Sequence, residues 1–104
     1  MNKFENREVK RHHMLEDLSI MYEGTTEEIC VQLPDLSTGG MFIPTQRVFP
    51  IGSVLKVEFR LPRSKYRVKA RAEVRHVKPG AGVGVEFIGL SAEAARAILA
   101  ETGE

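Results

Sequence analysis

Hydrophobic and charged residues alternate with a period of two over the middle of this chain. In residues 55–61 the odd positions hold Leu, Val, Phe and Leu, whereas the even positions hold Lys, Glu and Arg. In residues 66–75 the even positions hold Tyr, Val or Ala, and the odd positions hold Arg, Lys or Glu. Successive side chains of a strand point to opposite faces of a sheet, so both segments predict strands with one buried and one solvated face.

Shorter segments show the same alternation, and clusters of turn residues separate them. The further predicted strands are residues 18–22, 29–33, 41–43 and 83–87. Gly and Pro residues predict turns at residues 23–26, 35–40, 50–53 and 79–80. In the last strand, Gly82 and Gly84 indicate a bulge or a close approach of two backbones.

A short helix is predicted at the C-terminal end of the chain. Ser91 is a suitable N-cap, Gly103 ends the helix, and an apolar stripe lies between them at Ala94, Ala95, Ile98 and Leu99. A helix this short is marginal in water, so we expect it to dock over one end of the sheet. Six short strands followed by one helix predict a mainly-β fold, a six-stranded antiparallel barrel with a C-terminal helix.

Size and charge narrow the classes of function. The 104 residues fit a single domain, and 15 Lys and Arg against 14 Asp and Glu give a net charge of +1. This balance disfavours a polycation that coats nucleic acid or an anionic membrane. No apolar run approaches the roughly 18 residues of a membrane span.

The termini and the single cysteine bear on location. Residues 1–11 are polar and contain no apolar signal-peptide core, and Cys30 has no second cysteine with which to form a disulfide. We therefore expect a cytoplasmic protein. Because Cys30 lies in an apolar stretch without nearby groups that lower a thiol pKa, we expect an inert thiol in the core.

The first 17 residues differ from the rest of the chain. They are polar, show no period and carry a basic cluster, which consists of Arg7, Lys10, Arg11, His12 and His13. We predict a flexible N-terminal arm over residues 1–17 and the barrel with its helix over residues 18–104.

Residues for catalysis or metal binding are sparse. The three histidines are His12 and His13 in the arm and His76 in a strand, and none has a nucleophile and an orienting group at recognisable spacing. Two adjacent histidines without further ligands at suitable spacing do not make a metal site. We therefore expect neither an enzyme, nor a resident metal, nor a cofactor.

Two motifs occur in an informative order. Residues 7–11 read R-x-x-x-R, and residues 35–40 read D-x-S-x-x-G between two predicted strands. A third block, residues 82–87, reads Gly-Val-Gly-Val-Glu-Phe. In these three blocks the chain resembles the PilZ domain family, bacterial receptors for the second messenger cyclic di-GMP. The resemblance covers residues 5 to about 100 and implies the same barrel and helix as the alternation.

The resemblance implies a binding site for cyclic di-GMP and assigns its residues. By this resemblance the ligand-binding residues are Arg7, Arg11, Asp35, Ser37 and Gly40, and Lys10, Gly39 and Arg75 are further candidates. These residue types suit a ligand with two phosphates and two guanines. A guanidinium bonds bidentately to guanine or phosphate, a carboxylate accepts from guanine N–H groups, and glycines permit close backbone approach.

The resemblance also implies a mode of signalling. We expect a free-standing receptor or adaptor whose arm folds over the ligand and forms a new surface, which an unidentified protein effector reads. Many relatives carry a second arginine where this chain has Asn6. The number of ligands bound per protomer therefore stays open. The sequence also does not indicate the downstream process or the oligomeric state.

Two alternative functions stay open. One is a PilZ-like domain that binds only proteins and no nucleotide. The other is a nucleic-acid-binding barrel that uses one strand face, formed by Lys65, Arg67, Lys69 and Arg71. That face lacks interleaved aromatic side chains for base stacking, so a solvated outer face accounts for it better.

Overall fold

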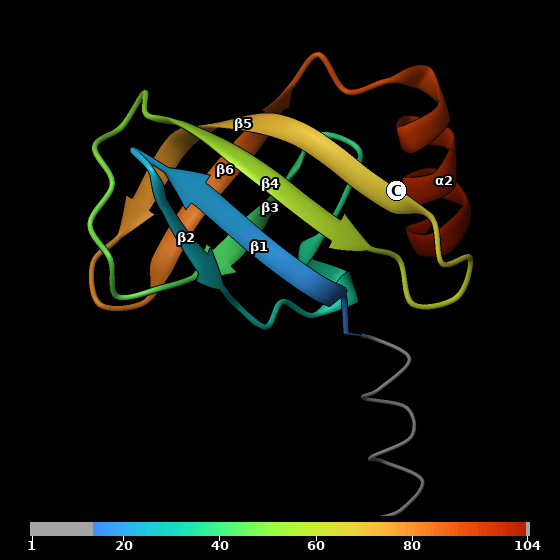
Figure 1. The fold of residues 1–104 in the computed structure, drawn as a ribbon, viewed down its shortest axis with the longest axis horizontal. Coiled ribbons are helices and arrows are strands. Elements are labelled where there is room, and N and C mark those ends of the chain that lie inside the picture. The colour runs from blue at the N-terminus through green and yellow to red at the C-terminus, as the bar shows by residue number, and fades with distance from the viewer. Residues whose placement is uncertain (1–13, 104) are drawn as a thin grey trace, which may run out of the picture.

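The computed structural model describes residues 14–103, which form one curled antiparallel sheet with a helix at its end (Figure 1). The strands are β1 (Glu16–Tyr22), β2 (Thr25–Glu28), β3 (Gly40–Pro44), β4 (Val54–Arg60), β5 (Arg67–Lys78) and β6 (Gly82–Ile88). A short 3₁₀ helix, η1 (Leu33–Asp35), precedes β3, and the helix α2 (Ala92–Thr102) follows β6.

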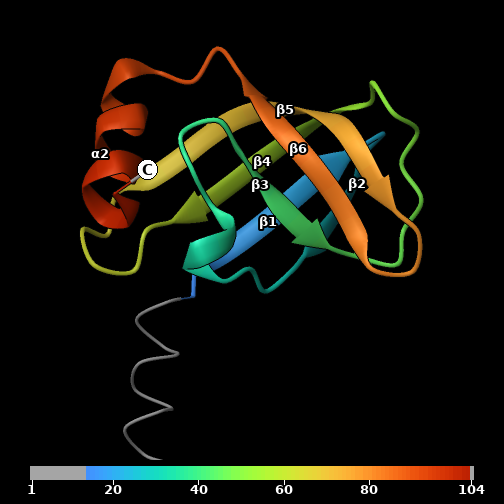
Figure 2. The same cartoon turned by 180° about the vertical axis from the view of Figure 1, so that it is seen from behind.

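The sheet has the strand order β2-β1-β4-β5-β6-β3, and every pair is antiparallel. Its strands curl around the core, as the view from behind shows (Figure 2). Within the described residues no ladder joins β2 to β3, so the architecture is a curled half-barrel with these two strands as its edges. This architecture confirms the predicted mainly-β class, the six antiparallel strands and the C-terminal helix.

Alternation explains the two long central strands. On β4, Leu55, Val57 and Phe59 are at most 2% exposed, while Lys56 between them is exposed. Val57 pairs directly with Ala70 of β5, so the apolar faces of both strands cover the same core. Burial of these side chains supplies the main driving force for the sheet.

The predicted strand at residues 29–33 is wrong, and the observed strand β2 lies earlier, at Thr25–Glu28. Residues 29–31 still run beside β1, because the Ile29 N–H donates to the Leu18 carbonyl at 3.1 Å and the Leu15 N–H donates to the Val31 carbonyl at 2.9 Å. Asp17 has a φ of 53°, and the register of β1 shifts between Glu16 and Ser19. This bulge interrupts the ladder. Val31 and Leu33 are nevertheless buried, as the alternation predicted.

Two side chains near the edge of the sheet, those of Cys30 and Glu27, lie where the sequence did not predict them. Cys30 is exposed, so the predicted core thiol is wrong. That prediction relied on the apolar neighbours of Cys30, but alternation turns its side chain outward, because Val31 next to it is buried. On β2, Glu27 pairs with the buried Ile20 and shares its inward face, and its Oε1 is buried without a hydrogen-bond partner in residues 14–103.

Two glycines permit β3 to lie close to β6. Gly40 pairs with Glu86, and a Cβ at position 40 would overlap the carbonyl oxygen of Val85. At the other end of the ladder, a Cβ on Gly82 would overlap the carbonyl oxygen of Ile43. The close approach predicted from the Gly-rich last strand is confirmed, and β5 also changes register opposite Gly84, between Val74 and His76.

Helix α2 is capped as predicted and is docked on the barrel. The Ser91 hydroxyl accepts from the Ala94 N–H at 3.0 Å, and Gly103 ends the helix with a φ of 77°. Ile98 is fully buried, while the Glu101 carboxylate accepts from two backbone N–H groups of the β4–β5 loop. The helix has 11 residues, and no helix within residues 14–103 is long and apolar enough to cross a membrane.

The docking of α2 predicts unequal effects of two neighbouring substitutions. Ile98→Ala removes a fully buried side chain and is expected to lower the free energy of unfolding by about 3 kcal/mol. Leu99→Ala is the control, because Leu99 is 51% exposed, and its expected cost is below about 1 kcal/mol. Urea denaturation followed by circular dichroism measures both. Equal losses would contradict the docked helix.

The β3–β6 contact predicts a second pair of outcomes. Gly40→Ala places a Cβ against the Val85 backbone and is expected to destabilise the fold by about 1–3 kcal/mol. Gly39→Ala meets only Ser37 Oγ, at 3.7 Å, so its expected cost is within about 0.5 kcal/mol. Thermal unfolding of the two variants makes the comparison, and a harmless Gly40→Ala would show that the backbones are not this close.

Candidate functional site

The turn that contains the D-x-S-x-x-G motif is fixed at both ends. Pro34 stands in the first turn of η1, and Asp35 is the last residue of that helix. Leu36 is buried and forms an isolated bridge with Met41, the second residue of β3. Asp35 and Ser37 therefore flank a residue that is anchored in the core, and Asp35 is exposed to solvent.

Hydrogen bonds inside the turn determine its shape. The Ser37 N–H donates to the Gly40 carbonyl at 2.9 Å, and the Gly39 N–H donates to Ser37 Oγ at 3.2 Å. The Gly39 carbonyl in turn accepts from the Phe87 N–H of β6 at 2.9 Å. Ser37 Oγ acts as an acceptor here, so its own proton stays available for donation to a ligand.

The register of β3, β6 and β5 brings Arg75 toward this turn. Gly40 pairs with Glu86, and the Glu86 carboxylate accepts from Arg75 Nη1 at 2.8 Å. Both side chains of this ion pair are 59% exposed. Glu73 is the residue of β5 that pairs with Glu86, and Arg75 lies two residues further along that strand. Arg75 is therefore two strands across and two residues along from Gly40, or about 12 Å away. Glu86 was not among the residues predicted from the sequence, although it lies within the Gly-Val-Gly-Val-Glu-Phe block.

Met14, the first residue that the structure describes, lies beside the same turn. Met14 forms an isolated bridge with Gln32, the residue that directly precedes η1. In both views of the ribbon the start of β1 lies next to η1 (Figures 1 and 2). Arg11 is three residues before Met14, and three extended residues span at most about 11 Å.

The other predicted residues of the arm lie outside the described part of the chain. Arg7, Lys10 and Arg11 belong to residues 1–13, as do His12 and His13. The structure thus places together Asp35, Ser37, Gly39 and Gly40, with Arg75 nearby through Glu86. Within residues 14–103 no group of three or more His, Cys, Asp or Glu side chains could hold a metal ion.

The basic strand face considered for nucleic acid is smaller than predicted, because β5 begins at Arg67 and Lys65 lies in the loop before it. The face is also partly neutralised. Lys65 Nζ lies 2.7 Å from Glu16 Oε2, and Arg67 Nη1 lies 2.9 Å from Glu58 Oε2. Only Lys69 and Arg71 of that set lack an ion-pair partner in the described residues. The alternation within one strand did not predict these carboxylate partners, because the partners lie on other strands and the register between strands was unknown.

The comparison with known families covers the turn, the strands and the arm together. A search of curated proteins found no match. A family model described as PilZ domain matches residues 5–102. The match includes the R-x-x-x-R segment, the turn at residues 35–40 and the last strand. Since it spans nearly the whole sequence, the chain belongs to the PilZ domain family.

Proposed function

We propose that this protein is a cytoplasmic receptor that binds cyclic di-GMP at the turn of residues 35–40 and passes the signal to a protein effector. The PilZ domain family is known for cyclic di-GMP binding and is a binding and signalling family rather than a catalytic one. The observation that carries the proposal is the bridge between Met14 and Gln32. Because Met14 follows Arg11 by three residues, this bridge supports a site formed jointly by the R-x-x-x-R segment and the D-x-S-x-x-G turn.

The residue types of the turn match the groups of the ligand. The exposed Asp35 carboxylate suits the N1–H and N2–H donors of guanine. Ser37 donates its hydroxyl proton to phosphate, while Gly39 and Gly40 let the ligand approach the backbone. Arg7 and Arg11 supply bidentate contacts to guanine or phosphate, and Lys10 adds positive charge.

Arg75 is a further contact whose present partner is easily exchanged. Its ion pair with Glu86 is largely solvated, and such pairs are worth only about 0–1 kcal/mol. A phosphate can therefore take the place of the Glu86 carboxylate at little cost.

The nucleic-acid alternative is less well supported. Lys65 and Arg67 are already paired with carboxylates, which leaves too few cations on that face to follow a phosphate backbone. A domain that binds only proteins is the remaining alternative, and absence of nucleotide binding would favour it.

Calorimetric titration with cyclic di-GMP tests the proposal. We expect saturable binding, and Arg11→Ala is expected to weaken it by about 1–3 kcal/mol, roughly fivefold to over a hundredfold, because a bidentate contact is lost. Arg96→Ala is the matched control, since this exposed arginine lies on α2. GTP should give no binding heat. No heat with cyclic di-GMP at millimolar concentration, or equal affinity of both variants, would overturn the assigned site.

If Arg75 contacts the ligand, substitution of its ion-pair partner Glu86 is expected to change the affinity for cyclic di-GMP. Glu86→Gln removes a carboxylate that holds Arg75, so we expect cyclic di-GMP affinity to rise by about twofold to fivefold. Glu58→Gln is the matched control, because Glu58 forms the same kind of pair with Arg67 on another part of the sheet. Calorimetry of both variants gives the comparison. An unchanged affinity for both Glu86→Gln and Arg75→Ala would remove Arg75 from the site.

A further inference from the structure

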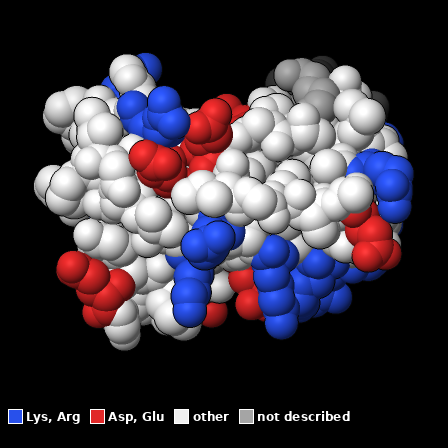
Figure 3. All heavy atoms as spheres, turned by 90° about the horizontal axis from the view of Figure 1, so that it is seen from above, with Lys and Arg blue, Asp and Glu red and all other residues white. Residues whose placement is uncertain are grey.

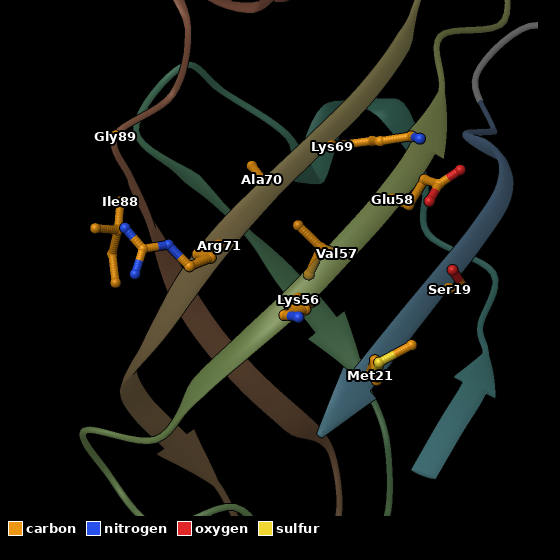
Figure 4. Close-up of a pocket in the computed structure, with 10 residues that line it drawn as sticks. All are labelled: Ser19, Met21, Lys56, Val57, Glu58, Lys69, Ala70, Arg71, Ile88 and Gly89. Atoms are coloured by element: carbon orange, nitrogen blue, oxygen red, sulfur yellow. The ribbon is translucent and has the colours of Figure 1, made fainter. Parts of the chain in front are cut away.

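A groove crosses the outer face of the sheet. It has a volume of about 410 Å³ and is lined by residues of β1, β4, β5 and the end of β6. Figure 4 shows its side chains on these strands. Its β6 end lies beside the turn of residues 35–40, because the Phe87 N–H, next to the lining residue Ile88, donates to the Gly39 carbonyl. Of the residues assigned to cyclic di-GMP, those within the described part of the chain do not line the groove.

Four side chains form a row across the floor of this groove. Met21 pairs with Lys56, Lys56 pairs with Arg71, and Arg71 pairs with Ile88. Directly paired residues share one face of a sheet, so the row runs over four neighbouring strands. Two cations therefore stand side by side, with an apolar side chain at each end.

The groove carries more positive than negative side chains within the described residues, although Glu58 lies directly opposite Lys69. Lys56 and Arg71 lie directly opposite each other, which is unfavourable for like charges, and Lys69 adds a third cation. In residues 14–103 none of the three forms an ion pair. Glu58 is the carboxylate of the groove, and it is already bonded to Arg67.

The surface view agrees with this local excess of charge. Lys and Arg side chains gather along the lower edge of Figure 3, the side that faces the viewer in Figure 1. The net charge of the whole chain is only +1, so the excess is confined to a small area. An uncompensated cation pair on a solvated surface attracts a carboxylate or another anion.

The apolar ends of the row indicate what kind of anion fits. Met21 is 44% exposed although it borders a groove, and Ile88 is half-buried. Their strands are separated by three spacings of about 4.8 Å, or about 14 Å. An extended peptide advances about 3.4 Å per residue, so its positions i and i+4 are also about 14 Å apart and face the same side.

We propose that this groove binds an extended acidic segment of a partner protein. The segment carries apolar residues at positions i and i+4, which contact Met21 and Ile88, and an acidic residue at i+2. That carboxylate lies between Lys56 and Arg71, and acidic residues at i+1 and i+3, which point away from the sheet, add negative charge near the three cations. The surface thus supplies a docking site for an effector beside the proposed nucleotide site.

A nucleic acid fits this surface less well. A protein that follows a DNA backbone through about 6–10 phosphate contacts needs a similar number of cations, whereas the described lining of this groove offers three without an ion pair. The neighbouring Arg60 and Lys65 are bonded to carboxylates of β1. No aromatic side chain of residues 14–103 lines the groove, so these residues supply no stacking platform for bases.

Amide NMR with a defined peptide tests the proposal. The probe is Gly-Ser-Leu-Glu-Asp-Glu-Leu-Ser-Gly, titrated without cyclic di-GMP. We expect saturable shifts at Met21, Lys56, Arg71 and Ile88. A peptide with Gln-Asn-Gln in place of Glu-Asp-Glu is expected to bind about tenfold more weakly, because charge-assisted bonds are lost. A peptide with two adjacent leucines and the same composition tests the spacing and is also expected to bind more weakly.

A matched pair of double variants connects binding to the groove. Lys56→Glu with Arg71→Glu is expected to abolish the shifts. Lys78→Glu with Arg96→Glu changes the net charge equally outside the groove and is expected to retain affinity within about twofold. Unfolding temperatures within a few degrees of the parent show that both variants are folded, which is expected for exposed positions.

Each contrary result has a definite meaning. No shifts at millimolar peptide, shifts outside the groove, or equal binding by both double variants overturns the proposal. A short single-stranded DNA that shifts the same amides at lower concentration than the peptide also overturns it, in favour of nucleic acid. Cyclic di-GMP titration of the Lys56→Glu, Arg71→Glu variant is a separate test. Retained binding there leaves the nucleotide site standing whatever the peptide shows.

Discussion

The close approach of β3 to β6 is the constraint on which the candidate nucleotide site depends. Gly40 and Gly82 lie where a Cβ would overlap a backbone carbonyl of the neighbouring strand. Because the strands are this close, the Phe87 N–H reaches the Gly39 carbonyl at 2.9 Å and fixes the turn before β3. Gly40 of the motif therefore has a structural role in the sheet. A turn held by the sheet has little freedom to lose when a ligand binds.

Charge on the outer face is arranged in local pairs with one exception. Arg60 lies 2.9 Å from Asp17, and comparable pairs join Lys65 to Glu16 and Arg67 to Glu58. These solvated pairs contribute little to stability, but they make most of the face electrically neutral. Lys56, Arg71 and Lys69 are that exception, because none of them forms an ion pair within the described residues. The net charge of the whole chain, +1, therefore does not indicate this small positive site.

Much of the fold was predictable from the sequence because its signals are local. Alternation identified β4 and β5, and Ser91 and Gly103 marked the ends of α2. The strand predicted at residues 29–33 was wrong because of the bulge at Asp17, and no residue pattern predicted the positive φ of that residue. Strand register was equally inaccessible. For this reason the sequence indicated Asp35 and Ser37 but neither the Arg75–Glu86 pair nor the juxtaposition of Lys56 and Arg71.

The inward carboxylate of Glu27 bears on how the open half-barrel avoids self-association. A free strand edge is a template onto which a strand of another chain can add. On β2, a strand added at the edge would cover Glu27 further, although its Oε1 already lacks a hydrogen-bond partner in residues 14–103. At the opposite edge, Pro44 ends β3 and has no N–H to offer. Both edges thus carry features that disfavour the addition of a strand from another chain.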